Sequence, residues 1–353
     1  MAVCFDLHPK FRLNGISYDL ETLLIYADTL CHSSDPTQKD LGIFLTQWLS
    51  DSTSIQLQTS GSTGEPKQIT ADKSKLIASA KATIKFLHLQ PQQTALLCLP
   101  LQYIGGKMML IRAMVGGLWI DVASPTATPF AGSKPYDFSA VTPYQLQHAL
   151  SDLHHIGQLL VGGAAVSTKL ANAIKGVGAQ VYETYGMTET FSHVALKNLS
   201  LGATDFHALS GISFTVEDEC LVVHAPHLMD KPIMTNDVVK LISNSSFVWL
   251  GRADHVINSG GIKLYPEQIE KQLSQLFNVP LMVFGMPDEA LGQSLSVVFE
   301  GALPENAEEI IKNSNLLSRY EKPKHLSVLS KFVRRNDKLI RHKTLEQLRT
   351  QSL

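Results

Sequence analysis

The segment Thr59-Ser-Gly-Ser-Thr-Gly-Glu-Pro-Lys67 decides the fold class, and the alternating stretch Ser54 to Thr59 that leads into it predicts a short β-strand. Its glycines let backbone amides turn toward an anion, its hydroxyls donate further hydrogen bonds, and Lys67 adds a positive charge. Phosphate suits this chemistry best. The P-loop of nucleoside triphosphatases differs, because it needs Gly-Lys-Ser/Thr and here Gln68 follows the lysine. A solvated Ser/Gly turn is the alternative.

Helical and strand-like patterns alternate through the first two thirds of the chain. Helices are expected at about residues 20–27, 40–49, 74–87, 108–115, 144–151 and 169–175, and strands at 95–99, 118–123, 158–161 and 180–183. Such alternation favours a mostly parallel sheet covered by helices. Ligands of open α/β sheets collect at the carboxyl ends of the strands, so polar loops that are distant in sequence are expected to share one crevice.

The pattern changes after Ile212. Short alternating strands at 215–217, 221–224, 238–242 and 247–250 predict an antiparallel section, and the last stretch predicts helices at 266–276 and 308–313 with strands at 281–285 and 295–300. The expected fold class is therefore α/β with mixed α+β character. With 353 residues, two domains are favoured over one. We expect a large N-terminal domain, residues 1–253, of mostly parallel sheet with a small antiparallel section, and a small mobile α+β domain, residues 254–353.

Composition narrows the function. The chain is 44% hydrophobic and 18% charged, as in soluble globular proteins, and its formal charge of -2 argues against a dedicated nucleic-acid binder. The four cysteines are far apart and form no CxxC pair, which favours reduced thiols over a disulfide framework or a structural metal. The N-terminus does not resemble a secretory signal, and the apolar region 96–123 is broken by Pro100, Lys107 and Arg112. A cytoplasmic protein without a membrane partner is expected.

Further motifs follow the phosphate-binding segment in a recognisable order. Residues 59–67 resemble the phosphate-binding signature of adenylate-forming ligases, the superfamily of acyl-CoA synthetases, luciferases and nonribosomal adenylation domains. Similar to other motifs of that superfamily are, in chain order, Gly162-Gly-Ala-Ala165, Tyr185-Gly-Met-Thr-Glu189, Thr235-Asn-Asp237, Gly251-Arg-Ala-Asp254 and Ser259-Gly-Gly261. Each is weak alone, because YGMTE also suits a helix N-terminus and GRAD a surface turn. Their shared order carries the resemblance.

The resemblance implies a role for each motif. Implied nucleotide-binding residues are Thr59, Ser60, Gly61, Ser62, Thr63, Gly64, Gly163, Ala164, Ala165, Tyr185, Gly186, Met187, Asp237 and Arg252. Implied catalytic residues are Lys67, Thr188, Glu189 and Lys338, with Glu189 also the ligand of Mg²⁺. Asp254 is the implied hinge, and Ser259, Gly260 and Gly261 face coenzyme A.

Lys338 is the least regular match. Residues 333–341, VRRNDKLIR, stand where the family usually has PRTxxGK, so the lysine and the following Ile-Arg are retained and the usual Thr and Gly are not. Lys343, or no residue at all, is the alternative to Lys338. The irregular segment also leaves open a nucleotide-binding relative without catalysis. Thr59 comes early for this family, so a shortened N-terminal part is expected.

The implied reaction has two halves. A carboxylic acid and MgATP give an acyl-adenylate and pyrophosphate, and the thiol of coenzyme A then gives an acyl-CoA and AMP. The first half brings two anions together, so Mg²⁺ and fixed cations must neutralise ATP. We expect the small domain to rotate between the halves. A carrier-protein thiol is the alternative acceptor, and the oligomeric state is left open.

Residues 99–112, LPLQYIGGKMMLIR, resemble the acyl-pocket region of o-succinylbenzoate:CoA ligases of menaquinone biosynthesis, which carry a basic residue at the position of Arg112. Gln102-Tyr103 replaces the family's aromatic-His pair. A buried Arg112 needs an anion, either a second carboxylate on the substrate or an internal acid. The expected substrate residues are Tyr103, Arg112 and Ser192, while His193 either joins them or lies at the surface or in packing. An aryl or short acyl acid is the alternative substrate.

Overall fold

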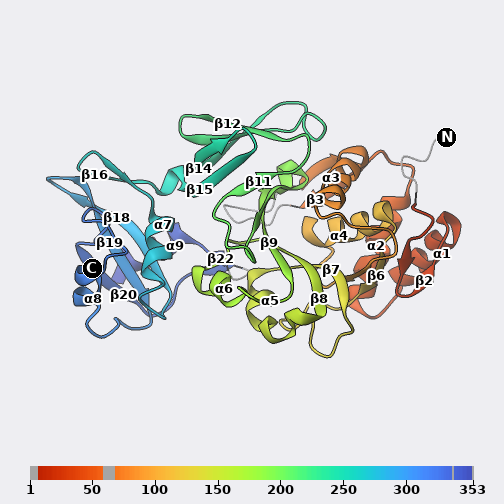
Figure 1. The fold of residues 1–353 in the computed structure, drawn as a ribbon, viewed down its shortest axis with the longest axis horizontal. Coiled ribbons are helices and arrows are strands. Elements are labelled where there is room, and N and C mark those ends of the chain that lie inside the picture. Colours follow the sequence, from red (N-terminus) through yellow and green to blue (C-terminus); the bar gives the residue numbers. More distant parts are fainter. Residues whose placement is uncertain (1–6, 59–67, 336–337, 352–353) are drawn as a thin grey trace. The chain divides into compact units, whose positions relative to one another are not determined.

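The computed structural model describes residues 7–58, 68–335 and 338–351, and the chain divides into two units (Figure 1). The first unit holds the chain up to Val166, together with Ala173–Ser213 and His224–Pro232. The second holds Ser167–Asn172, Phe214–Val223 and the chain from Ile233 onward.

A mostly parallel sheet forms the centre of the first unit. Its parallel strands, in spatial order, are β1 (Arg12–Leu13), β6 (Trp119–Val122), β5 (Thr94–Leu97), β7 (Tyr136–Val141), β8 (Ile156–Val161) and β9 (Gln180–Met187). Antiparallel strands β2 (Ile16–Ser17), β10 (Ser192–Asn198) and β11 (Phe206–Ala208) extend it. The predicted parallel sheet is confirmed. Strands β7 and β10 were not predicted.

Helices pack around this sheet. They are α1 (Leu20–Cys31), α2 (Pro36–Leu49), α3 (Lys73–Phe86), α4 (Ile104–Gly116) and α5 (Pro143–His148), followed by the 3-10 turn η1 (Leu150–His155). Helix α4 contacts α3 and strands β5, β6, β7 and β10 (Figure 1). Its residues from Gly106 to Met114 are all buried, as expected of a helix that is apolar on every side. Arg112 therefore lies in the core of this unit.

The phosphate-loop segment lies outside the described residues, but its two ends are described. Strands β3 (Ser54–Gln58) and β4 (Gln68–Asp72) form an antiparallel hairpin in which Gln58 pairs with Gln68. The predicted strand before the loop is confirmed, and the return strand β4 was not predicted. Residues 59–67 thus connect two paired strands.

The second unit contains the antiparallel strands predicted after Ile212. These are β12 (Ser213–Glu217), β13 (Cys220–His224), β14 (Ile233–Ser243) and β15 (Ser246–Arg252). A five-stranded sheet follows, drawn in teal to blue in Figure 1, with β16 (Ile257–Ser259), β17 (Ile262–Leu264), β18 (Leu281–Asp288), β19 (Gly292–Glu300) and β20 (His325–Leu329). The unit's helices are α6 (Thr168–Ala173), α7 (Pro266–Leu273), α8 (Ala307–Asn313) and α9 (Arg341–Gln351), with the hairpin β21 (Arg334–Arg335) and β22 (Lys338–Leu339) before α9.

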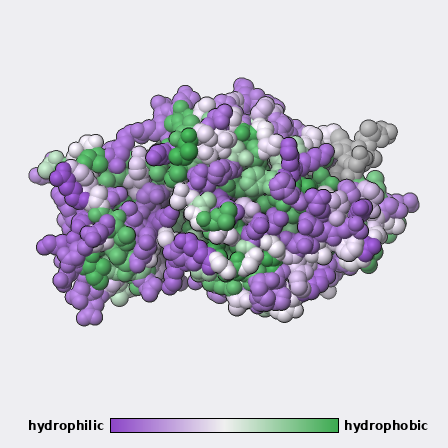
Figure 2. Space-filling model, viewed as in Figure 1, coloured by the Kyte–Doolittle hydropathy of each residue, from purple (hydrophilic) through white to green (hydrophobic). Residues whose placement is uncertain are grey.

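The expected boundary at Asp254 falls inside the second unit, in the 3-10 turn η3 (Ala253–His255). The two compact units do not show whether the chain rotates at Asp254, so the hinge stays a prediction. No helix among the described residues is long and apolar enough to cross a bilayer. Hydrophilic residues cover most of the face seen in Figure 2, and apolar residues form separate small patches between them.

Candidate active site

The YGMTE motif forms the end of a tight β-hairpin in the first unit. Strand β9 ends at Met187, the 3-10 turn η2 (Thr188–Thr190) follows, and β10 returns from Ser192. The buried Thr190 hydroxyl accepts a hydrogen bond from the Met187 amide at 2.9 Å and lies 2.7 Å from the Ser192 carbonyl oxygen. Of the helix N-terminus considered as the alternative, the structure has only the 3-10 turn η2, which Met187 caps and which places Glu189 in its first turn. The hairpin holds Thr188 and the exposed Glu189 at its tip.

Gly186 is required where the two strands of this hairpin come closest. A Cβ atom there would lie 2.3 Å from the carbonyl oxygen of Ser192 and 2.4 Å from the Cα of His193. Neither backbone atom can move without breaking the strand pairing. Next to it, the ring of Tyr185 lies 5.7 Å from that of Phe206, centroid to centroid.

The structure brings the GGAA motif beside YGMTE. Strands β8 and β9 are parallel neighbours with Val161 opposite Glu183, so residues 162–165 leave the sheet at the same edge as the end of β9, which carries the YGMTE motif. Glu183 accepts a hydrogen bond from the Val166 amide at 3.0 Å, which ties down the far end of the GGAA segment. A Cβ on Gly162 would meet the Thr184 hydroxyl oxygen at 2.5 Å.

Glu183 is itself held by a buried ion pair. Its carboxylate lies 2.5 Å from the Lys197 ammonium, and both side chains are largely buried. No sequence motif indicates this pair. It connects three features of the site: the GGAA segment, strand β9 and strand β10.

Two further motifs meet within the second unit. Antiparallel pairing of β14 and β15 places Asp237 opposite Arg252. The Asp254 carboxylate accepts hydrogen bonds from Asn236 at 2.8 Å and from the Arg252 Nε at 3.2 Å, and Trp249 donates to Asp237 at 3.0 Å. Burial alone would raise the pKa of Asp254, but its hydrogen bond from Arg252 and the nearby positive charges lower it overall. The predicted ribose-binding and hinge residues are therefore neighbours.

The predicted glycine loop borders an open pocket within the second unit. Gly260 and Gly261 have φ angles of 57° and 81°, in the left-handed region, and turn the chain between β16 and β17. The pocket, of about 240 Å³, is lined by Ser259, Gly260, Ile262, Leu291, Leu295, Arg319, Tyr320, Lys322 and Lys324. Its basic side chains come from the segment before β20 and were not predicted.

Lys338 begins strand β22 of a short hairpin, and its side chain lies outside what the structure describes. The hairpin is anchored on both sides. Arg334 forms an ion pair with Glu300 at 2.5 Å, and Arg341, at the start of α9, forms one with Glu270 at 2.7 Å. Lys343, the alternative catalytic lysine, is exposed on α9.

Arg112 is a buried cation in the first unit. It is 2% exposed, and its Nη2 donates a hydrogen bond to the Ser192 hydroxyl at 3.0 Å. Its Nε is buried without a hydrogen-bond partner, and no carboxylate among the described residues forms an ion pair with it. Burial lowers the pKa of Arg112 to about 9, so the side chain is still charged at pH 7. The internal acid expected as an alternative is not found in the described part of the chain.

Tyr103 is not brought to Arg112. It precedes the first residue of α4 and is 37% exposed, about 13 Å along the helix axis from Arg112. Gln102, beside it, donates to Asp40 at 3.2 Å.

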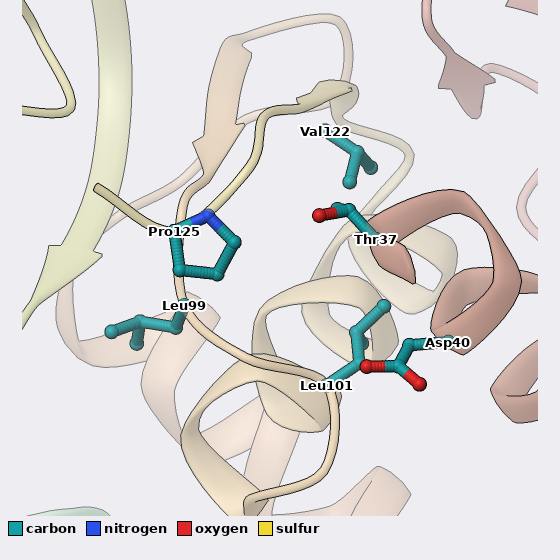
Figure 3. A pocket seen from close by; sticks show the side chains of 6 residues that line it. All are labelled: Thr37, Asp40, Leu99, Leu101, Val122 and Pro125. Atoms are coloured by element: carbon teal, nitrogen blue, oxygen red, sulfur yellow. The ribbon is translucent and has the colours of Figure 1, made fainter. Parts of the chain in front are cut away.

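A small pocket near Asp40 was not predicted. Thr37 and Asp40 of α2 line it, together with Leu99, Leu101, Val122 and Pro125 from the carboxyl ends of β5 and β6 or the loops after them (Figure 3). At about 20 Å³ it is too small for a nucleotide, and it contains none of the expected site residues.

Comparisons with known proteins agree on one family. Residues 35–219 match the family described as AMP-binding enzyme. A probable 2-succinylbenzoate–CoA ligase of Mycobacterium tuberculosis is 28% identical over 317 residues, which cover 81% of this chain and 82% of that protein. The 2-succinylbenzoate–CoA ligase of Bacillus cereus is 26% identical over 337 residues, covering 83% and 69%.

Solved structures give the same fold. An acyl-CoA synthetase (AMP-forming)/AMP-acid ligase II-like protein from Dyadobacter fermentans is 37% identical, with a TM-score of 0.61, covering 91% of this chain and 97% of its own. The o-succinylbenzoate coenzyme A synthetase of Bacillus subtilis, in complex with ATP and magnesium ion, has a TM-score of 0.72 at 21% identity, covering 82% and 69%. At that identity the second likeness supports the fold alone.

Proposed function

The chain belongs to the AMP-binding enzyme family, and from this premise we propose that it is an ATP-dependent acid–CoA ligase that converts o-succinylbenzoate to o-succinylbenzoyl-CoA. The observation that carries the choice of acid is the buried Arg112, whose Nε has no hydrogen-bond partner among the described residues. Relatives named as 2-succinylbenzoate–CoA ligases support the same substrate. We place the reaction in the cytoplasm and in menaquinone biosynthesis.

In the first half-reaction the acid's carboxylate oxygen attacks the α-phosphorus of ATP, and pyrophosphate leaves. The hairpin of residues 185–189 supplies a rigid edge to the nucleotide site, with Tyr185 on the adenine side. Glu189 offers a carboxylate at the exposed tip, an oxygen ligand of the kind that Mg²⁺ prefers. Bound Mg²⁺ neutralises phosphate charge. Lys338 is the proposed cation at the reacting carboxylate.

A buried guanidinium that has no acidic partner in the described part of the chain fits a substrate with two carboxylates. One carboxylate reacts, and the other meets Arg112. Leaving a cation buried and unpaired costs several kcal/mol as an order of magnitude, so the free protein gives up stability that the bound diacid restores. A monocarboxylic acid gives no such compensation, which disfavours the aryl and short acyl acids considered as alternatives.

In the second half-reaction the thiol sulfur of coenzyme A attacks the acyl carbon, and AMP leaves. The pocket beside Ser259 and Gly260 combines apolar walls with Arg319, Lys322 and Lys324. Cations of this kind suit the phosphate groups of coenzyme A. A carrier-protein thiol remains the alternative acceptor.

ATP–pyrophosphate exchange measured over a panel of acids tests the proposal. The panel contains o-succinylbenzoate, benzoate, a short fatty acid, and two analogues that each lack one carboxylate of o-succinylbenzoate. We expect o-succinylbenzoate to give the highest kcat/KM, by about 100-fold. A higher value for benzoate or the fatty acid would select the alternative substrate class, and nucleotide binding without exchange for any acid would select the non-catalytic relative.

A further inference from the structure

Four polar side chains of the first unit form one hydrogen-bonded chain that ends at Arg112. They come from three elements: Thr83 from α3, His193 and Ser192 from β10, and Arg112 from α4. The Thr83 hydroxyl lies 2.9 Å from His193 Nε2, the His193 Nδ1 lies 3.4 Å from the Ser192 hydroxyl, and Arg112 donates to that hydroxyl at 3.0 Å. Thr83, His193 and Arg112 are all buried.

The hydrogens of this chain can be assigned from its fixed end. We assign the Thr83 hydroxyl hydrogen to the carbonyl oxygen of Ser79, which lies 3.2 Å away, so that Thr83 accepts a hydrogen bond from His193. His193 therefore carries its hydrogen on Nε2 and presents a bare Nδ1 to Ser192. The Ser192 hydroxyl donates to that nitrogen and turns its lone pairs toward Arg112. In this assignment every polar hydrogen between Thr83 and Ser192 has an acceptor. If His193 instead donated from Nδ1 to Ser192, the hydroxyl hydrogen of Ser192 would have no acceptor among these four side chains.

His193 must be neutral for this arrangement. Burial, and secondly the charge of Arg112, hold the pKa of His193 well below its ordinary value. A second cation here would also take away the acceptor that orients Ser192. The sequence pattern left His193 open between substrate contact, packing and surface, and its 6% exposure excludes the surface.

We propose that Thr83 and His193 are positioning residues that act through Ser192 to hold the guanidinium of Arg112 ready for the substrate's second carboxylate. The hydrogen-bonded chain occupies Nη2 of Arg112, while Nε has no partner among the residues that the structure describes. Neither Thr83 nor His193 needs to touch the substrate. Their effect is therefore confined to acids that carry the second carboxylate. This proposal rests on the proposed function, because it requires Arg112 to recognise a diacid.

The test compares Thr83→Val, Thr83→Ser and His193→Gln with the wild type. Valine has the shape of threonine without the hydroxyl, and serine keeps the hydroxyl. Glutamine keeps an amide that reaches toward Thr83 but offers no acceptor at the position of Nδ1. ATP–pyrophosphate exchange is measured with o-succinylbenzoate and with whichever of its two single-carboxylate analogues, 4-oxo-4-phenylbutanoate or 2-butanoylbenzoate, keeps the reacting group. Tm is measured for each variant.

We expect Thr83→Val and His193→Gln to raise KM for o-succinylbenzoate by about tenfold, which is the effect of losing one hydrogen bond, and to leave KM for the analogue unchanged. Thr83→Ser should restore the wild-type value. An equal rise for both acids, or no rise, would overturn the proposal and leave these residues a purely structural role. If the wild type itself fails to use o-succinylbenzoate, the proposed function fails first, so the two failures are distinguishable.

Discussion

Arg112 Nη2 donates a hydrogen bond to the Ser192 hydroxyl at 3.0 Å, which joins the middle of the buried helix α4 to the first residue of β10. Ser192 lies three residues after Glu189, the last residue of the YGMTE motif. Arg112, the residue expected to determine acid specificity, is thus hydrogen-bonded to the hairpin that is expected to bind the nucleotide. Both lie in the first unit, so this connection does not depend on the second.

Replacing Arg112 with methionine should raise KM for o-succinylbenzoate by about 100-fold. The replacement should also raise Tm, because methionine removes a buried cation that has no carboxylate partner among the described residues. Exchange kinetics and thermal unfolding measure the two effects. Arg112→Lys is the control. It keeps the charge but loses the guanidinium geometry, so its KM for o-succinylbenzoate should lie between those of the wild type and Arg112→Met. A loss of stability in Arg112→Met would show that the arginine has a structural partner.

Gly186→Ala should abolish most adenylation, because its Cβ would lie 2.3 Å from the Ser192 carbonyl oxygen. We expect exchange activity to fall by more than tenfold and Tm to fall as well. Gly178→Ala is the matched control, since its Cβ would have no atom within 4 Å and its φ is not positive. Equal behaviour of the two variants would contradict the close approach of β9 and β10.

Glu183→Gln should destabilise the protein by about 3 kcal/mol, because it leaves the Lys197 ammonium buried without its partner. Urea unfolding measures the free-energy change. The double variant Glu183→Gln with Lys197→Met should recover most of that loss, since no charge is then left unpaired. KM for ATP should stay raised in both, because the Val166 amide then has only a neutral acceptor. Additive losses in the double variant would count against the ion pair.

Charge reversal in the pocket beside Gly260 should separate the two half-reactions. Arg319→Glu and Lys322→Glu should each raise KM for coenzyme A by about tenfold and leave ATP–pyrophosphate exchange unchanged. Acyl-CoA formation and exchange are assayed on the same preparations. Lys240→Glu, which reverses the charge of an exposed lysine of β14 outside that pocket, is the control. A change in exchange with no change in KM for coenzyme A would contradict the assignment of this pocket.

Strand and helix patterns predicted most of the fold, because apolar runs in the parallel strands and helical periodicity are local signals. Strands β7 and β10 were missed for different reasons. Residues 136–141 follow a stretch rich in Pro, Ser and Gly, and residues 192–198 follow so closely on YGMTE that their pairing with β9 is a property of the hairpin. Strand β4 was missed because its polar residues face outward from a two-stranded hairpin.

The sequence motifs predicted the residues of the candidate site better than the residues that hold them in place. The meeting of Asp237 with Arg252, and of the GGAA segment with YGMTE, could be predicted from motif order and sheet topology. The sequence could not predict the roles of Glu183, Lys197 and Thr83. A buried ion pair or a buried hydroxyl contact depends on which strands and helices become neighbours in the fold. Residues 59–67 and the side chain of Lys338 lie outside the described residues, so their roles stay predictions.

Direct detection of the acyl-adenylate tests the central claim. The wild-type protein is mixed with ATP, Mg²⁺ and o-succinylbenzoate in the absence of coenzyme A, and the products bound to it are identified by mass spectrometry. We predict one o-succinylbenzoyl-AMP per active site together with released pyrophosphate. Bound ATP that stays intact, with no adenylate formed from this acid or any other in the panel, would contradict the account.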